Sequence, residues 1–247
     1  MIYVITHKDF NDQLSFGQCD FYTVLHVGGR QFGKNYLRDD TGDNISAKNK
    51  NYCELTGYYW LWKNAKESSG DILGVVHYRR GFSGFANGVK SIALKKDYIP
   101  LKKCECEKIL AKYDFICPVK HVFFKDTVYG QYAKAHDASD VDAIRKIVNA
   151  KYPEYIASFD KMFGGHKLYT GNLFITKKEL FDSYCSWLFD ILFEFEKGND
   201  IEKYTREYNK RVYGFLAERL LNVFLLHNKF KIKELPAINI EKYCKNY

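Results

Sequence analysis

A short apolar run that stops abruptly on two arginines constrains the fold of this chain more than any other feature. Ile72-Leu73-Gly74-Val75-Val76 is followed at once by His77-Tyr78-Arg79-Arg80. Such a run fits a buried parallel strand, and open α/β sheets bind ligands in the crevice outside the carboxyl ends of such strands. Two guanidinium groups there predict an anion, because their planar forks match phosphate oxygens. The alternative is an arginine pair that is salt-bridged to acidic neighbours.

The patterns on both sides of this run predict one α/β domain over residues 1–247. Apolar and β-branched runs predict strands at 2–6, 22–27, 72–77, 113–117 and 172–176, in a mostly parallel sheet. Helical spacing of apolar residues predicts helices at 52–62, 103–112, 141–152, 154–163, 178–196 and 201–226. The segment 231–240 fits an edge strand, and we expect residues 242–247 to be a loose tail.

Segments without a clear period connect these elements. Residues 30–50 form a long polar loop, in which Asp43 and Asn44 either hydrogen-bond a ribose or sugar hydroxyl or form an Asx turn before the next helix. Residues 121–137 form either the wall or lid of a site or a surface loop, and Ser139-Asp140 can cap the helix that follows. Glycines mark an irregular segment after Arg80: Gly81, Gly84 and Gly88.

Composition narrows the class of protein. The 247 residues are 46% hydrophobic, enough for a sizeable core, and no Pro/Gly/Ser-rich linker divides them. The net charge of +8 comes from scattered lysines, which fits a small anion or a membrane surface better than nucleic acid. We expect no signal peptide, no membrane span and a cytoplasmic location. The cysteines match no zinc motif and are expected to be reduced thiols: Cys19, Cys53, Cys104, Cys106, Cys117, Cys185 and Cys244.

Other polar residues stand at the ends of the predicted elements. Thr6-His7-Lys8 follows the first strand, like the turn after the first strand of nucleotide-binding sheets. Gly171-Asn172 opens the strand at 172–176. Arg211 and the pair Glu218-Arg219 stand in a strongly apolar helical segment, where charges pair with each other or with a ligand.

These motifs resemble those of a known family. The order strand, strand, loop, helix and apolar strand with a polar end is similar to the GT-A nucleotide-sugar fold. More closely, the chain resembles a bacterial family of capsular-polysaccharide, exopolysaccharide and O-antigen glycosyltransferases, long catalogued as a domain of unknown function. The shared residues run from Asp43 to Asn222: Asp43-Asn44-Ile45-Ser46, Asn49, Tyr52-Cys53-Glu54-Leu55-Thr56, Tyr59-Trp60, Trp62-Lys63-Asn64, His77-Tyr78-Arg79-Arg80, His136, Gly171-Asn172, Tyr184-Cys185, Arg211-Val212-Tyr213-Gly214-Phe215 and Glu218-Arg219-Leu220-Leu221-Asn222.

The resemblance implies a GT-A-like domain with C-terminal helices that transfers a sugar, galactofuranose or galactose, from a UDP-sugar. The acceptor would be an oligosaccharide or a lipid-linked glycan at the cytoplasmic face of the inner membrane. We expect the donor to be bound by residues at the strand ends and in the shared motifs: Thr6, His7, Lys8, Asp43, Asn44, His77, Tyr78, Arg79, Arg80, Gly171, Asn172, Arg211, Glu218 and Arg219.

The chain departs from ordinary GT-A enzymes at the place where they carry a metal-binding DxD motif. His77, Arg79 and Arg80 cannot supply the oxygen ligands that Mg²⁺ or Mn²⁺ prefers, so we expect the cations to replace the metal and no cofactor to be required. Asp39-Asp40 is the only adjacent carboxylate pair in the first half of the chain, and it is a weak metal candidate.

The base and the activity itself are left open by the sequence. His136 and Asp137 are candidates for a catalytic base, and Glu54, Asp114 and Glu218 are weaker ones. Glu54 is also a candidate partner for an arginine. The alternative to an enzyme is a carbohydrate- or nucleotide-binding module without turnover. The donor sugar, acceptor, stereochemical course and oligomeric state are not determined.

Overall fold

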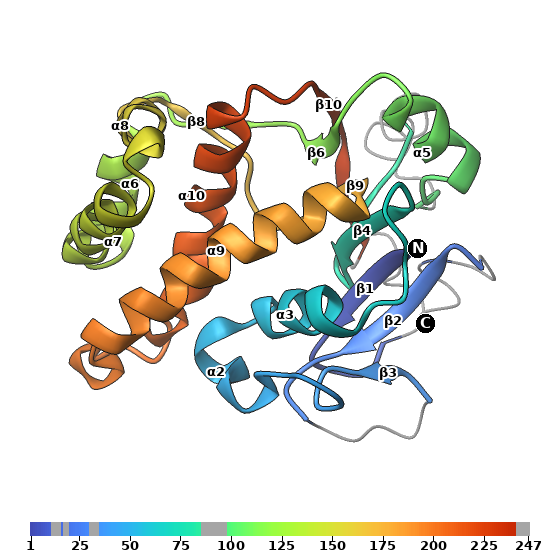
Figure 1. The fold of residues 1–247 in the computed structure, drawn as a ribbon, viewed down its shortest axis with the longest axis horizontal. Helices are drawn as coiled ribbons and strands as arrows, with labels where there is room; N and C mark the ends of the chain where they lie inside the picture. The colour runs from blue at the N-terminus through green and yellow to red at the C-terminus, as the bar shows by residue number, and fades with distance from the viewer. Residues whose placement is uncertain (11–15, 17–19, 30–34, 85–97, 241–247) are drawn as a thin grey trace.

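The computed structural model describes residues 1–10, 16, 20–29, 35–84 and 98–240, and its centre is one large sheet (Figure 1). The described strands run in the order β10-β6-β9-β4-β1-β2-β3, with β5 and β11 joined beside β4. The strands of this sheet are β1 Ile2–Thr6, β2 Tyr22–His26, β3 Leu37–Arg38, β4 Ile72–His77, β5 Arg80–Phe82, β6 Phe115–Pro118, β9 Phe174–Lys177, β10 Ile232–Leu235 and β11 Ala237–Asn239. A separate hairpin pairs β7 His121–Val122 with β8 Lys167–Leu168.

The expectation of a mostly parallel sheet is confirmed, with one informative exception. β1 is parallel to both β2 and β4, and β6 is parallel to β10. β9, however, lies between β4 and β6 and is antiparallel to both. Because β9 runs the opposite way, its amino-terminal end meets the carboxyl ends of β4 and β6 at one edge of the sheet.

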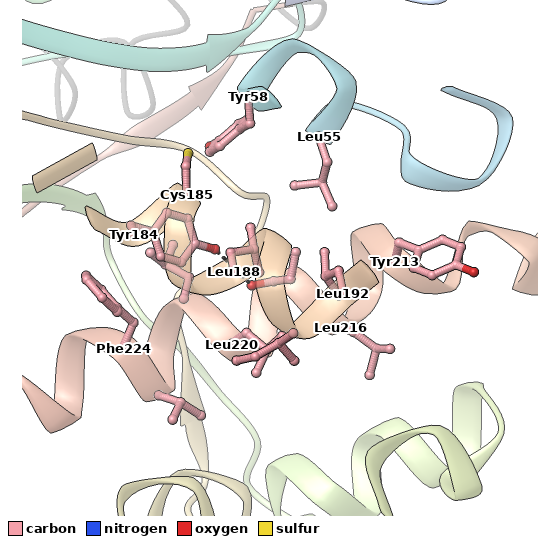
Figure 2. Close-up of a cluster of buried hydrophobic side chains, with 14 of the residues drawn as sticks. Leu55, Tyr58, Tyr184, Cys185, Leu188, Leu192, Tyr213, Leu216, Leu220 and Phe224 are labelled. Carbon is pink, nitrogen blue, oxygen red and sulfur yellow. Dashed lines mark hydrogen bonds between the residues drawn. The ribbon is translucent and has the colours of Figure 1, made fainter. Parts of the chain in front are cut away.

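Helices cover both faces of the sheet. They are α2 Asn49–Tyr52, α3 Leu55–Asn64, α5 Lys103–Leu110, α6 Val128–Ala135, α7 Ala138–Lys151, α8 Ile156–Phe163, α9 Lys178–Gly198 and α10 Val212–His227, with single 3-10 turns at Ser46–Lys48, Pro153–Tyr155, Ile201–Lys203 and Asn209–Arg211. The larger core lies where α3, α9 and α10 meet, and Figure 2 shows Tyr58, Leu188 and Leu220 from these helices packed together. A second core on the opposite face joins α5 to β1, β4 and β11.

Several predicted boundaries are wrong where long-range contacts decide the backbone. The helix expected at 201–226 begins at Val212, because the polar segment before it forms two short turns and Tyr204 is held on Asp140. The helix expected at 52–62 is broken at Cys53, whose φ is +52°. The edge strand at 231–240 is confirmed but is split at Pro236, which has no N–H to continue the ladder.

The connecting segments also contain more regular structure than expected. Residues after Arg80 form the short strand β5 instead of an irregular segment, while Gly88 lies outside the described residues. Residues 121–137 form β7 and α6. The next helix, α7, is capped by Asp137, whose side chain accepts a hydrogen bond from Ser139 N, so the cap is not Ser139-Asp140. The tail expected at 242–247 lies outside the described residues. None of the described helices is both long and apolar enough to cross a membrane.

Candidate functional site

The carboxyl ends of β1 and β4 open into a cavity of about 690 Å³. Its wall is assembled from six parts of the chain: the end of β1 and the turn after it, the residue after β2, α2 with the break before α3, the β4–β5 turn, Gly171 before β9, and the segment around the start of α10. The lining residues are Ile5, Thr6, His7, Lys8, Val27, Asn49, Lys50, Cys53, Glu54, His77, Tyr78, Arg79, Arg80, Gly171, Tyr208, Arg211, Phe215 and Glu218. A cavity at the carboxyl ends of parallel strands is where this class of sheet binds its ligands.

The β4–β5 turn presents two arginines to the cavity. The chain reverses through Tyr78 and Arg79, so that Arg80 pairs with His77 across the turn. Both guanidinium groups are exposed, and neither forms an ion pair with any residue that the structure describes. The alternative of a salt-bridged structural pair is therefore wrong for the described part of the chain, and both groups are available to an anion.

Tyr78 organises the cations around it. Its ring is buried, with Lys8 Nζ at 5.0 Å and Arg79 Cζ at 5.3 Å from the ring centre. His7 meets the same ring edge-on at 5.4 Å. The turn after β1 and the turn after β4 are thus joined through one aromatic side chain, which serves as a cation–π platform and not as an exposed stacking surface.

Gly171 allows the start of β9 to approach Arg80 closely. Its φ is +91°, and a Cβ atom at this position would lie 3.1 Å from Arg80 Nη1 and 2.8 Å from Leu173 Cδ2. Its backbone N–H donates to Glu218 Oε1 at 2.6 Å. Glycine is needed here for both the backbone conformation and the close approach.

Two glutamates face the cations. Glu54 Oε1 accepts a hydrogen bond from Asn172 Nδ2 at 2.6 Å, and the same amide donates to Gly214 O at 3.0 Å. Both oxygens of Glu218 are engaged, by Gly171 N and by Arg219 Nη1 at 2.9 Å. Burial raises the pKa of Glu218, and the Arg219 charge opposes that shift. No described residue donates to Glu54 Oε2, so this carboxylate keeps a lone pair for a ligand.

His77 contributes no charge to the site near neutral pH. Burial lowers the pKa of its imidazole; Glu54 opposes this shift, whereas Arg80 and Arg79 reinforce it. Its buried Nε2 has no hydrogen-bond partner among the described residues. The cationic character of the cavity therefore comes from lysines and arginines.

Arg211, the residue directly before α10, lines the cavity. Its Nε donates a hydrogen bond to Cys53 Sγ at 3.1 Å. Burial raises the pKa of Cys53 to about 11, so this thiol is protonated at neutral pH. The site role of Cys53, and those of Asn49, Lys50, Tyr208 and Phe215, were not predicted from the sequence. The break at Cys53 has no local sequence signal, because neither glycine nor proline marks it.

Some predicted site residues lie outside the cavity lining. Asn44 accepts from Ser46 N and Asp43 accepts from Tyr59 Oη, so the turn interpretation of this pair is correct and the predicted donor contact is not supported by the geometry. Asp137 is the N-cap of α7, and this structural role accounts for an aspartate at this position. Asp114 Oδ2 accepts from Lys231 N at the other end of β6.

His136 and Arg219 stand directly behind the lining. The His136 ring stacks on Phe215 at 4.1 Å, and burial lowers its pKa. Arg219 is buried and donates to Phe215 O and Gln131 Oε1 as well as to Glu218. Both residues support groups that line the cavity. The buried Asn172 does the same through Glu54.

The described residues contain no cluster of three or more His, Cys, Asp or Glu side chains that could hold a metal ion. Asp39 is buried and accepts from Gly28 N and Ser46 Oγ, whereas Asp40 pairs with Arg38. The only adjacent carboxylate pair in the first half of the sequence thus has structural partners.

Comparisons with known proteins agree with this architecture. A family model described as "Domain of unknown function (DUF4422)" matches residues 1–229. No curated protein matches the chain. Among solved structures, the chain is similar to the apo structure of the WbbM bifunctional glycosyltransferase, with 29% sequence identity and a TM-score of 0.80. The similarity covers 97% of this chain and 45% of that one, so the chain spans less than half of that relative. The expected GT-A-like α/β fold class is confirmed.

Proposed function

The chain belongs to the family described as Domain of unknown function (DUF4422), and we propose that it is a glycosyltransferase that uses a UDP-sugar donor. Similarity to a bifunctional glycosyltransferase over nearly the whole chain supports a transferase. The proposed reaction transfers galactofuranose or galactose to a glycan or lipid-linked acceptor in bacterial surface polysaccharide synthesis, on the cytoplasmic side of the membrane.

The unpaired arginines of the β4–β5 turn carry this proposal. A nucleotide diphosphate needs two or more cationic groups on one side, and Arg79 and Arg80 lie in the cavity without carboxylate partners among the described residues. Gly171 lets the Arg80 guanidinium lie close to the backbone at the cavity wall. The base and ribose then lie toward Thr6, His7 and Lys8, at the end of β1.

In the proposed mechanism the arginines take the place of a divalent metal. As the bond from the sugar to UDP breaks, negative charge develops on the diphosphate, and two guanidinium groups stabilise it by bidentate hydrogen bonds. A second cation at the same phosphates would be repelled by this cluster. We therefore expect turnover to survive EDTA; loss of turnover with full rescue by Mn²⁺ would contradict the metal-free mechanism.

Glu54 is the best-placed of the candidate bases proposed from the sequence. It lines the cavity and has an oxygen free of described donors, whereas His136 lies behind Phe215 and Asp137 caps α7. An inverting transfer needs such a group to accept the proton of the acceptor hydroxyl.

Calorimetric titration with UDP tests the donor site. Losing a charged partner in a desolvated site costs about 2–5 kcal/mol, so Arg79→Ala should weaken UDP binding more than tenfold. Arg145→Ala is the matched control, because Arg145 pairs with Asp160 outside the cavity lining and its loss should leave UDP affinity unchanged. Equal UDP affinities of the wild type and Arg79→Ala would show that the arginines do not bind the donor.

A further inference from the structure

Exposed apolar side chains gather around one small hairpin. Among the described residues, three of the seven exposed large hydrophobic side chains lie within residues 119–129, at Val119, Phe124 and Tyr129. Phe124 is 92% exposed, the largest fraction in this set. Val119 is 57% exposed, as is Tyr208, which lines the cavity. Such exposure of a phenylalanine has no packing role in the described fold, so it points to a contact outside the chain.

The hairpin holds Phe124 outward. β7 pairs with β8 and Phe123 N donates to His166 O at 2.7 Å, so the backbone on this side is fixed. Phe124 lies in the bend that directly follows Phe123. Phe123 packs against the main core, and Phe124 faces solvent on a preformed support.

The charges on this hairpin are of one sign. Residues 119–125 and 164–168 contain Lys120, Lys125 and Lys167 and no acidic residue. Lys125 and Lys167 are exposed and form no ion pair with any described residue, and Lys120 lies over the Tyr169 ring at 4.7 Å. The next carboxylate along the chain, Asp126, pairs with Lys134 and is only partly exposed. We define Val119, Phe124, Lys125 and Lys167 as the hairpin face.

The hairpin face adjoins the cavity along the chain. β8 continues through Tyr169 and Thr170 to Gly171, which lines the cavity. Four residues span at most about 14 Å, so Lys167 and the cavity wall lie within that distance.

We propose that the hairpin face docks on an anionic lipid bilayer. A protruding aromatic side chain with exposed lysines, whose neighbouring carboxylate Asp126 is paired with Lys134, fits the boundary between acyl chains and anionic headgroups. A pair of protruding apolar side chains is far smaller than the roughly 800 Å² per partner of a stable protein interface. The proposal goes beyond the sugar transfer and does not rest on it, because docking needs neither donor nor acceptor.

Sedimentation with lipid vesicles tests this surface. The full chain is mixed with vesicles of phosphatidylcholine alone or with added phosphatidylglycerol, without any sugar nucleotide. We expect binding to the anionic vesicles that weakens with salt. One lysine near an anionic surface contributes about fivefold in partition, so Lys125→Glu with Lys167→Glu should lower binding more than tenfold. Val119→Ser with Phe124→Ser should lower it severalfold at the same net charge.

Matched controls change the same residue types elsewhere. Leu37→Ser alters another exposed hydrophobic residue on β3, at the opposite edge of the sheet, and Lys108→Glu with Lys112→Glu alters two exposed lysines near the end of α5 (Figure 1). Circular dichroism spectra and melting temperatures equal to those of the wild type show that the hairpin variants fold. Absence of wild-type binding to anionic vesicles, or equal losses in hairpin and control variants, would overturn the proposal. Either result would leave the donor site standing.

Discussion

At the scale of single residues, the cavity lining combines cationic side chains with two glutamates that are held in different ways. Glu54 is held by Asn172 through one oxygen and presents the other to the cavity. Glu218 has a similar position but binds Gly171 and Arg219 with both oxygens. The two carboxylates are thus held differently: Glu218 fixes the backbone beside Arg80, and Glu54 is the base of the proposed mechanism.

Replacing Glu54 with glutamine should separate turnover from binding. The amide side chain of Glu54→Gln would keep an oxygen for Asn172 but could not accept a proton, so we expect transfer to fall about 10²–10⁴-fold with UDP affinity nearly unchanged. UDP release in the presence of acceptor and calorimetry with UDP measure the two effects. Full transfer activity in Glu54→Gln would exclude Glu54 as the base, and loss of transfer with intact UDP binding is not expected for a protein that only binds sugars.

At the scale of elements, a buried carboxylate joins α6, α7 and the turns before α10. Asp140 is fully buried, and it accepts from Tyr204 Oη at 2.6 Å, Lys203 Nζ at 2.8 Å and Tyr132 Oη at 3.3 Å. Tyr132 also lies beneath the Arg219 guanidinium at 5.2 Å. This network fixes the segment that carries Tyr208 and Arg211 to the helices behind the cavity.

The Asp140→Asn variant tests how much this network contributes to the stability of the fold. It removes the charge that accepts hydrogen bonds from Tyr204 and Lys203, while Asp137 still lies 3.7 Å from Lys203, so we expect the free energy of unfolding to fall by about 2 kcal/mol. Asp142→Asn is the control, since Asp142 is exposed on the same helix and should change stability by less than about 0.5 kcal/mol. Urea denaturation compares the two variants; similar midpoints would mean that solvent reaches the Asp140 cluster.

At the scale of the whole molecule, buried histidines couple stability to pH. Burial lowers the pKa of His77 and of His136 in the folded protein. Below an unfolded pKa of about 6.5 the unfolded chain binds protons that the folded chain does not. The stability they contribute is therefore complete above that pH and is lost as the pH falls toward the folded pKa values.

Acidification from pH 7.5 to 5.5 should accordingly destabilise the protein. Each histidine contributes a slope of up to about 1.4 kcal/mol per pH unit over this window. His77→Gln removes one of these groups, so its melting temperature should depend less on pH than that of the wild type. Thermal unfolding followed by circular dichroism at both pH values checks this, and parallel pH profiles of the two proteins would show that His77 titrates normally in the folded state.

The sequence by itself determined the elements whose signals are local. Apolar runs bounded by polar residues correctly predicted β1, β2, β4, β6 and β9, because burial of a short strand depends on its own side chains. The cationic end of β4 was predicted for the same reason, since the apolar run and the arginines are adjacent along the chain. The family resemblance added that Glu54, Gly171 and Glu218 belong with this turn.

Only the tertiary structure decided how these parts meet. The direction of β9 depends on which strands flank it and not on its own residues, and this direction places Gly171 beside Arg80. The break at Cys53, which turns Glu54 into the cavity, arises from packing against α10 and has no local signal. Asp43 and Asp137 carry the right chemical groups, but their backbone positions commit them to a turn and a helix cap. The sequence specifies the chemical type of each side chain, whereas contacts between distant segments determine which side chains become its neighbours.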